Sequence, residues 1–89
     1  MALVNFVSPY HKITGTKQAE IQAGSVRELC LAIIDKYGDE MKFILDEKGE
    51  LSRKIVLFVN GRNAYTLEGS DTTLDSDSKV HIMSFLGWA

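Results

Sequence analysis

Few side chains in this sequence could do chemistry of their own. His11 and His81 lie far apart, and neither has a cysteine or a spaced acid that would complete a set of metal ligands. Asp71, Asp75 and Asp77 resemble calcium ligands only superficially, because the EF-hand order of acids around a central glycine is missing, so turn capping explains them better. The sequence has neither a nucleophile elbow nor a phosphate-binding glycine loop. We therefore expect no catalytic residue and no metal site.

The C-terminal segment is the one stretch suited to handling by another protein. Residues 79–85 alternate polar and apolar side chains, which predicts a half-buried strand, and the chain then continues as Leu86-Gly87-Trp88-Ala89 without a charge. Glycine adds no side chain, so a slim segment of this kind fits a narrow site in a partner. We predict that residues 86–89 form a flexible tail.

Length, composition and charge indicate one soluble globular domain over residues 1–89. The formal charge of −2 disfavours nucleic acid as a partner. No apolar run approaches the ~18 residues of a membrane span, and Cys30, the only cysteine, cannot form an intramolecular disulfide. Cys30 lies on an apolar helical stripe, which favours a buried core thiol over a reactive one. We expect a cytoplasmic protein that does not bind membranes.

The first half of the chain predicts a hairpin followed by a helix. Residues 3–7 and 17–22 have strand character, and residues 10–16 are interpreted as the loop that joins them. Ser25 and Glu28 form the pattern of a capping box, which predicts a helix start. Apolar residues then recur at helical spacing up to Tyr37, and Gly38 is a typical stop.

The second half predicts another hairpin and a final strand. Residues 39–45 favour a short helical turn, residues 55–59 the strongest strand, and Asn60-Gly61 a tight turn with a return strand over 64–67. Residues 68–78 read as a loop, with Leu74 in the core. This order predicts an α+β fold of the ubiquitin-like β-grasp type. One main helix would pack across one face of a mixed sheet of four to five strands, with the last strand beside the first.

Alternation along the predicted strands divides their side chains between two faces. If Val4, Phe6, Leu57, Val80 and Ile82 face the helix, the opposite face carries Val56, Phe58, His81 and Met83. Its apolar members would form a patch that faces water, which commonly marks a partner contact. The alternative is a one-residue slip in one strand, which would reverse that strand's faces.

Several motifs, in this order and spacing, resemble the MoaD/ThiS family of ubiquitin-like sulfur carriers over essentially the full length. They are Phe6-Val7 with His11 to Lys17, Ser25 to Leu29 with Lys36-Tyr37-Gly38, Val59-Asn60-Gly61-Arg62, and Gly69 to Leu74 before Val80-His81-Ile82.

The resemblance implies a carrier without catalytic residues or a bound cofactor. A partner adenylyltransferase, similar to ubiquitin-activating enzymes, would use ATP to activate the carrier's C-terminal glycine for conversion to a thiocarboxylate. The sulfur would pass to an accepting synthase, such as the large subunit of molybdopterin synthase, or to another acceptor. The implied partner contacts are Val56, Phe58, Arg62, His81, Met83, Phe85 and Leu86.

The sequence departs from the family at its end, because the family ends in Gly-Gly and this sequence in Gly87-Trp88-Ala89. Three interpretations stay open. A metalloprotease could trim Trp88 and Ala89 to expose Gly87; a variant activating enzyme could accept the present end; or the chain could be a degenerate relative. The third interpretation gives the alternative function, a protein-interaction module without sulfur-carrier activity.

Overall fold

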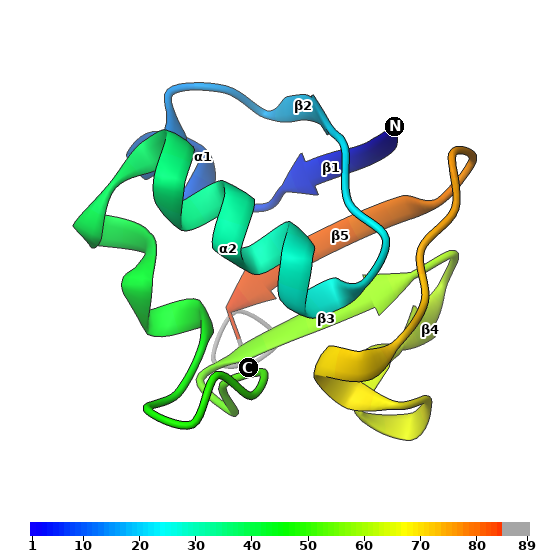
Figure 1. Cartoon of the computed structure of the whole chain (residues 1–89). Coiled ribbons are helices and arrows are strands. Elements are labelled where there is room, and N and C mark those ends of the chain that lie inside the picture. Colours follow the sequence, from blue (N-terminus) through cyan, green and yellow to red (C-terminus); the bar gives the residue numbers. More distant parts are fainter. Residues whose placement is uncertain (85–89) are drawn as a thin grey trace.

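The strands form one mixed sheet with the last strand in its middle. The computed structural model describes residues 1–84. The strands are β1 (Ala2–Phe6), β2 (Gln18–Ile21), β3 (Ile55–Val59), β4 (Arg62–Asn63) and β5 (Lys79–Ser84), in the order β2-β1-β5-β3-β4. As Figure 1 shows, β5 runs parallel to β1 on one side and antiparallel to β3 on the other. The predicted place of the last strand, beside the first, is confirmed.

The main helix, α2 (Val26–Tyr37), lies across one face of the sheet (Figure 1). The Ser25 hydroxyl accepts from the backbone N–H of Glu28 at 3.2 Å, as a capping residue should. The Glu28 carboxylate accepts instead from the N–H of Gly24, at 2.8 Å, one residue earlier than a reciprocal capping box requires. The helix ends at Gly38, whose φ of 87° suits glycine. The inward side chains predicted for the strands, from Val4 to Ile82, are all buried under this helix.

The segment predicted as a hairpin loop contains a helix, α1 (Tyr10–Thr14), so the loop prediction was wrong over those residues. The helix has no side-chain cap and ends at Gly15 with φ 77°. It is anchored by Tyr10, which is buried with its ring centroid 5.3 Å from that of Phe43. Tertiary packing therefore fixes a turn that the local sequence does not encode.

The return strand of the second hairpin was also misplaced. Asn60 and Gly61 have φ of 51° and 83°, as the two-residue turn requires, and pairing resumes at once with Arg62 opposite Val59. The predicted strand over 64–67 is instead the 3₁₀-helix η2 (Ala64–Thr66) and the residue after it. The short helical turn predicted after α2 is confirmed as the 3₁₀-helix η1 (Asp39–Ile44). The predicted burial of Leu74 is also confirmed; this residue follows a third 3₁₀-helix, η3 (Gly69–Asp71).

Side-chain hydroxyls form hydrogen bonds with backbone groups along both edges of the sheet. On β2, the Thr16 hydroxyl donates to the carbonyl of Gln18 at 2.8 Å and accepts from its N–H at 3.4 Å. On the other edge, the Tyr65 hydroxyl contacts the carbonyls of Ser52 and, at 3.2 Å, Ile55. Such contacts disfavour the addition of a further strand at these points. Within residues 1–84, no helix is long and apolar enough to cross a membrane.

Candidate functional site

A row of four side chains crosses the face of the sheet that lies opposite α2, here called the outer face. Phe58 of β3 pairs with His81 of β5, His81 with Asn5 of β1, and Asn5 with Gln18 of β2. Residues paired in this way share a face, with neighbouring Cβ atoms about 5 Å apart. The row passes from an aromatic ring at one end to amides at the other, so the outer face has an apolar half and a polar half.

The apolar half is narrower than the alternation of residues predicts. Val56 pairs with Met83 and lies outside the core cluster, as expected for the outer face. Its exposed fraction is only 3%, however, so the prediction that Val56 faces water was wrong. Phe58 and Met83 are half-buried and provide the solvent-facing apolar surface. Alternation gives the direction of a side chain but not its coverage by neighbours.

Arg62 is exposed but does not join this row. It pairs with Val59, whose side chain is in the core, so the register places Arg62 on the side of β4 opposite to Phe58. Arg62 therefore lies apart from Phe58, and its role as a partner contact stays a prediction. The other predicted contact and tail residues lie outside the described part of the chain; they are Phe85, Leu86, Gly87, Trp88 and Ala89.

The polar half of the outer face contains an open hollow of about 770 Å³ between β2, β1 and β5. The amide of Gln18 donates to Oδ1 of Asn5 at 2.8 Å, which leaves the Asn5 amide nitrogen available to a ligand. No carboxylate of the described residues lines the hollow. The residues that line it include Asn5, Val7, Thr16, Lys17, Gln18 and His81.

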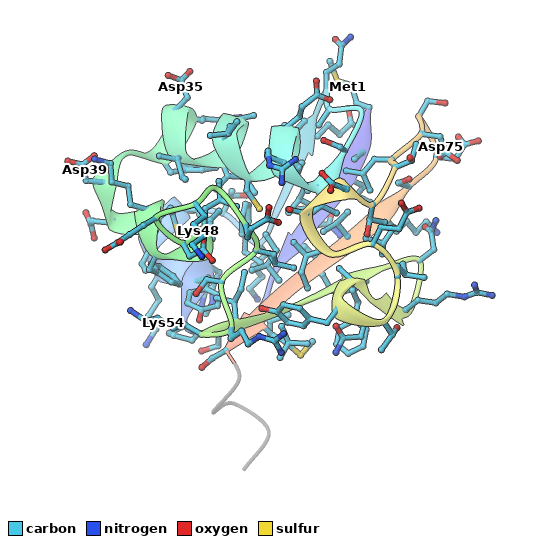
Figure 2. All side chains as sticks on the ribbon, turned by 60° about the horizontal axis from the view of Figure 1, so that its bottom comes forward. Met1, Asp35, Asp39, Lys48, Lys54 and Asp75 are labelled. Carbon is cyan, nitrogen blue, oxygen red and sulfur yellow. The ribbon has the colours of Figure 1, made fainter. Side chains whose placement is uncertain are left out.

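This hollow lies near the end of β5. Parallel strands end at the same edge of a sheet, and the N–H of Val7, just after β1, donates to the carbonyl of Ile82 at 2.9 Å. On the other side of β5, Ser84 pairs with Ile55, so Lys54 marks the same edge (Figure 2). The hollow and the end of β5 therefore lie at the same edge of the sheet.

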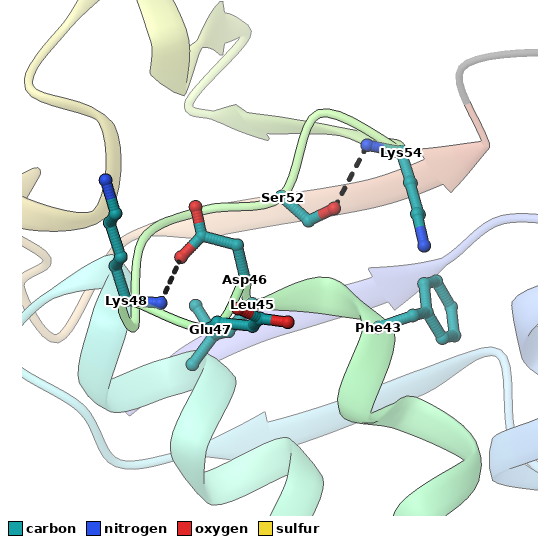
Figure 3. Close-up of a pocket in the computed structure, with 7 residues that line it drawn as sticks. All are labelled: Phe43, Leu45, Asp46, Glu47, Lys48, Ser52 and Lys54. Atoms are coloured by element: carbon teal, nitrogen blue, oxygen red, sulfur yellow. Dashed lines mark hydrogen bonds between the residues drawn. The ribbon is translucent and has the colours of Figure 1, made fainter.

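A second pocket, of about 500 Å³, lies between the loop after η1 and the start of β3 (Figure 3). Its charges are balanced, since Asp46 and Glu47 stand against Lys48 and Lys54. Asp46 also serves the loop itself, because its Oδ1 accepts from the N–H groups of Lys48 and Glu50 at 2.8 and 2.9 Å. We therefore assign this pocket to the structure of the loop.

Cys30 has the character predicted from its place on the helix. The residue is fully buried, and burial raises the pKa of its thiol to about 12. The thiolate is the reactive form of cysteine, so Cys30 is inert near neutral pH.

Arg27 is the residue that sequence analysis missed. Its guanidinium donates to the carbonyl of Gly49 at 3.0 Å, Ser70 Oγ at 2.8 Å, Glu50 at 3.0 Å and Asp71 at 2.5 Å. The hydrogen bond to Asp71 is the main cause that raises the pKa of Arg27 above its usual value. Arg27 thereby joins α2 to the loop before β3 and to η3. The available signal was a pair of acids, Glu50 and Asp71, in segments that the sequence predicts as a turn and a loop.

Asp71 therefore forms an ion pair, and its assignment to turn capping was wrong. That assignment holds for Asp75, whose Oδ1 accepts from the N–H of Asp77 at 2.9 Å and from the Ser78 hydroxyl at 3.2 Å. Among residues 1–84, no cluster of three or more His, Cys, Asp or Glu side chains is arranged to hold a metal ion.

Known proteins share both the sequence pattern and the fold, although no family model matches the sequence. An Archaeoglobus fulgidus protein with the provisional name of sulfur carrier protein is 33% identical over 69 residues, which are 78% of each chain. The solution structure of small archaeal modifier protein 1 from Methanosarcina acetivorans has a TM-score of 0.80 at 27% identity, covering 93% of this chain and 90% of that one.

A chain of the Amycolatopsis orientalis BexX/CysO complex has a TM-score of 0.85 with 94% of each chain covered, and its 18% identity supports the fold alone. Together with the central β5 and the single helix across the sheet, these likenesses confirm the β-grasp architecture and the resemblance drawn from the motifs. The chain belongs to the MoaD/ThiS-like family of ubiquitin-like sulfur carrier proteins.

Proposed function

We propose that this chain carries sulfur as a thiocarboxylate on a C-terminal glycine, and that Gly87 is that glycine once Trp88 and Ala89 have been removed. The observation that carries the proposal is the position of β5. It is held between two neighbouring strands, and its last residue, Ser84, precedes Gly87 by only three positions. The anchored strand would present a short segment to the enzyme that activates it.

The chemistry would be supplied by partners. An adenylating enzyme similar to ubiquitin-activating enzymes would join the Gly87 carboxylate to the α-phosphate of ATP and release pyrophosphate. A sulfur donor at the oxidation level of sulfide would then displace AMP and leave the thiocarboxylate. Cys30, the only thiol of the chain, is buried and protonated near neutral pH, which supports a carrier whose reactive group is its terminus rather than a side chain.

Intact-mass measurement on three chain lengths tests the proposal. Chains that end at Gly87, Trp88 and Ala89 are each incubated with a candidate adenylating enzyme, ATP and a sulfide donor. We expect one exchange of oxygen for sulfur on the chain that ends at Gly87 and none on the other two. A chain ending at Gly87 with Gly87→Val is the matched control, because a side chain there should block entry into a channel shaped for glycine.

The other results are equally informative. Exchange on the chain that ends at Ala89 would show that a variant enzyme accepts the present end and that trimming is unnecessary. No exchange on any length, with an enzyme that modifies its own established carrier in parallel, would refute the carrier proposal.

The second candidate function is an interaction module without sulfur transfer, favoured by Phe58 and Met83 on the outer face. For this function, Phe58→Asp should abolish binding of the partner, while removal of residues 87–89 should leave binding unchanged. If the truncated chain also loses the partner, the interaction module fails as an explanation.

A further inference from the structure

The last pair that the structure describes in the ladder between β3 and β5 is Ile55 with Ser84. Hydrogen-bonded and non-hydrogen-bonded pairs alternate along antiparallel strands. Asn60 donates to the carbonyl of Lys79 at 2.8 Å. Counting along the register from that bond makes Ile55–Ser84 a non-hydrogen-bonded pair. The next rung would therefore be completed by the N–H of Lys54, bonded to the residue after Ser84.

The hydroxyl of Ser52 already occupies this donor. Ser52 Oγ accepts from the N–H of Lys54 at 3.1 Å, and Ser52 is only 7% exposed (Figure 3). A serine that binds the N–H two residues further on competes with the ladder of a strand. The Tyr65 hydroxyl contacts the Ser52 carbonyl, and the Ser52 N–H donates to the carbonyl of Ile44 at 2.9 Å. Ser52 is therefore held from both sides, and the chain before β3 runs toward η1 instead of along β5.

The parallel ladder on the other side of β5 stops at the same level. The N–H of Val7 donates to the carbonyl of Ile82 at 2.9 Å. The next donor toward β5 would belong to the residue two positions on, and Pro9 has no N–H. The Val7 carbonyl accepts from the N–H of Tyr10 at 2.9 Å, so the chain turns away into α1. Within residues 1–84, the backbone donor in register with the chain beyond β5 is therefore the N–H of Lys54.

We propose that the Ser52 hydroxyl ends the β3–β5 ladder and so leaves all of residues 85–87 to the enzyme that activates Gly87. Gly87 follows Ser84 by three positions, which span about 10 Å when extended. A further complete rung would hold the first of these residues in the sheet and shorten the reach to about 7 Å. Ser52 is thus a positioning residue that acts through Lys54. The proposal rests on the proposed function for its purpose, while the hydrogen bonds belong to this chain.

Scalar couplings across hydrogen bonds test this stop without any partner. In the full chain labelled with ¹³C and ¹⁵N, a long-range HNCO spectrum should show no coupling from the Lys54 nitrogen to the Phe85 carbonyl carbon. In Ser52→Ala the freed N–H should bond to that carbonyl, and the coupling should appear. Ser52→Thr keeps the hydroxyl and should resemble wild type. The matched control is Ser78→Ala, because Ser78 is also buried and its hydroxyl accepts from the N–H of Asp75 at 2.9 Å, just before β5.

Three results of these spectra would overturn the proposal. A coupling between Lys54 and Phe85 in wild type would show that the ladder continues despite Ser52. Its absence from Ser52→Ala would show that the hydroxyl is not what ends the ladder. Its appearance in Ser78→Ala would attribute the change to the loss of any buried hydroxyl rather than to the position of this one.

Adenylation of the chain that ends at Gly87 tests the positioning role. One net hydrogen bond shifts an equilibrium by about fivefold, so Ser52→Ala should raise KM for the chain by about that factor and leave kcat unchanged. Ser52→Thr and Ser78→Ala should keep the wild-type KM. If the coupling appears in Ser52→Ala but KM is unchanged, the positioning role is refuted while the carrier function stands. If no form of the chain is adenylated, the carrier function fails, and the coupling spectra alone decide whether Ser52 ends the ladder.

Discussion

Replacement of Arg27 by methionine should destabilise the protein measurably, although its side chain is at the surface. Methionine keeps an unbranched apolar stem and removes all four hydrogen bonds of the guanidinium. The bonds to the Gly49 carbonyl and to the hydroxyl of buried Ser70 should account for most of the loss. The ion pairs should contribute less, because the Glu50 and Asp71 side chains are 51% and 64% exposed.

Thermal and urea unfolding measure this loss, and Lys36→Met is the matched control on the same helix. Arg27→Met should lower Tm and the urea midpoint several-fold more than Lys36→Met does, because the control removes a charge without removing contacts between segments. Arg27→Lys should recover less than half of the loss, because an ammonium cannot reproduce the planar fork of donors. If Arg27→Met is as stable as Lys36→Met, the four contacts do not stabilise the fold and the reasoning is refuted.

Three further predictions concern Cys30, Tyr65 and Leu74. Because burial raises the pKa of Cys30, its thiolate forms more easily in the unfolded chain. The free energy of unfolding should therefore fall as pH rises from 9.0 toward about 12. In Cys30→Ala, measured by unfolding at the same pH values, this decrease should be absent. Tyr65→Phe should lose about 1 kcal/mol in urea unfolding, since its hydroxyl satisfies carbonyls at the edge of β3; an unchanged midpoint would show that water replaces it. Leu74→Ala should cost about 2–4 kcal/mol in the same assay, and a loss below 1 kcal/mol would contradict its place in the core.

The elements that sequence predicted best are those whose signals are local. Ser25 fixes the start of α2, and the helical spacing from Val26 to Ile33 selects the buried side chains. The period-two pattern of β5 correctly orients Val80 and Ile82 toward the core. Both periodic patterns extend over enough residues to distinguish a helix from a strand.

The errors arise where distant contacts decide the structure. The single turn of α1 depends on Tyr10 packing against Phe43, more than thirty positions away. Val56 points as alternation predicts, yet its burial depends on neighbours that a strand pattern does not include. The error in the return strand did not depend on distant contacts. A two-residue turn at Asn60-Gly61 already requires Arg62 to pair with Val59, so the sequence could have predicted this strand correctly.

The candidate site was only partly predictable for the same reason. Phe58, His81 and Met83 follow from alternation once the strands are known. The hollow requires the neighbour order β2-β1-β5, which brings Gln18, Asn5 and His81 into one row. The Arg27 contacts join three segments that no sequence period relates.

The parallel pairing of β1 and β5 determines how the molecule bears mechanical load. β1 begins at the N-terminal edge of the sheet and β5 ends at the opposite edge, so a pull that separates the start of β1 from the end of β5 acts along both strands. Their cross-strand hydrogen bonds must then break together in shear rather than one after another, as they would if peeled apart. A motor that drags this domain by the residues after β5 would meet its greatest resistance at the first step.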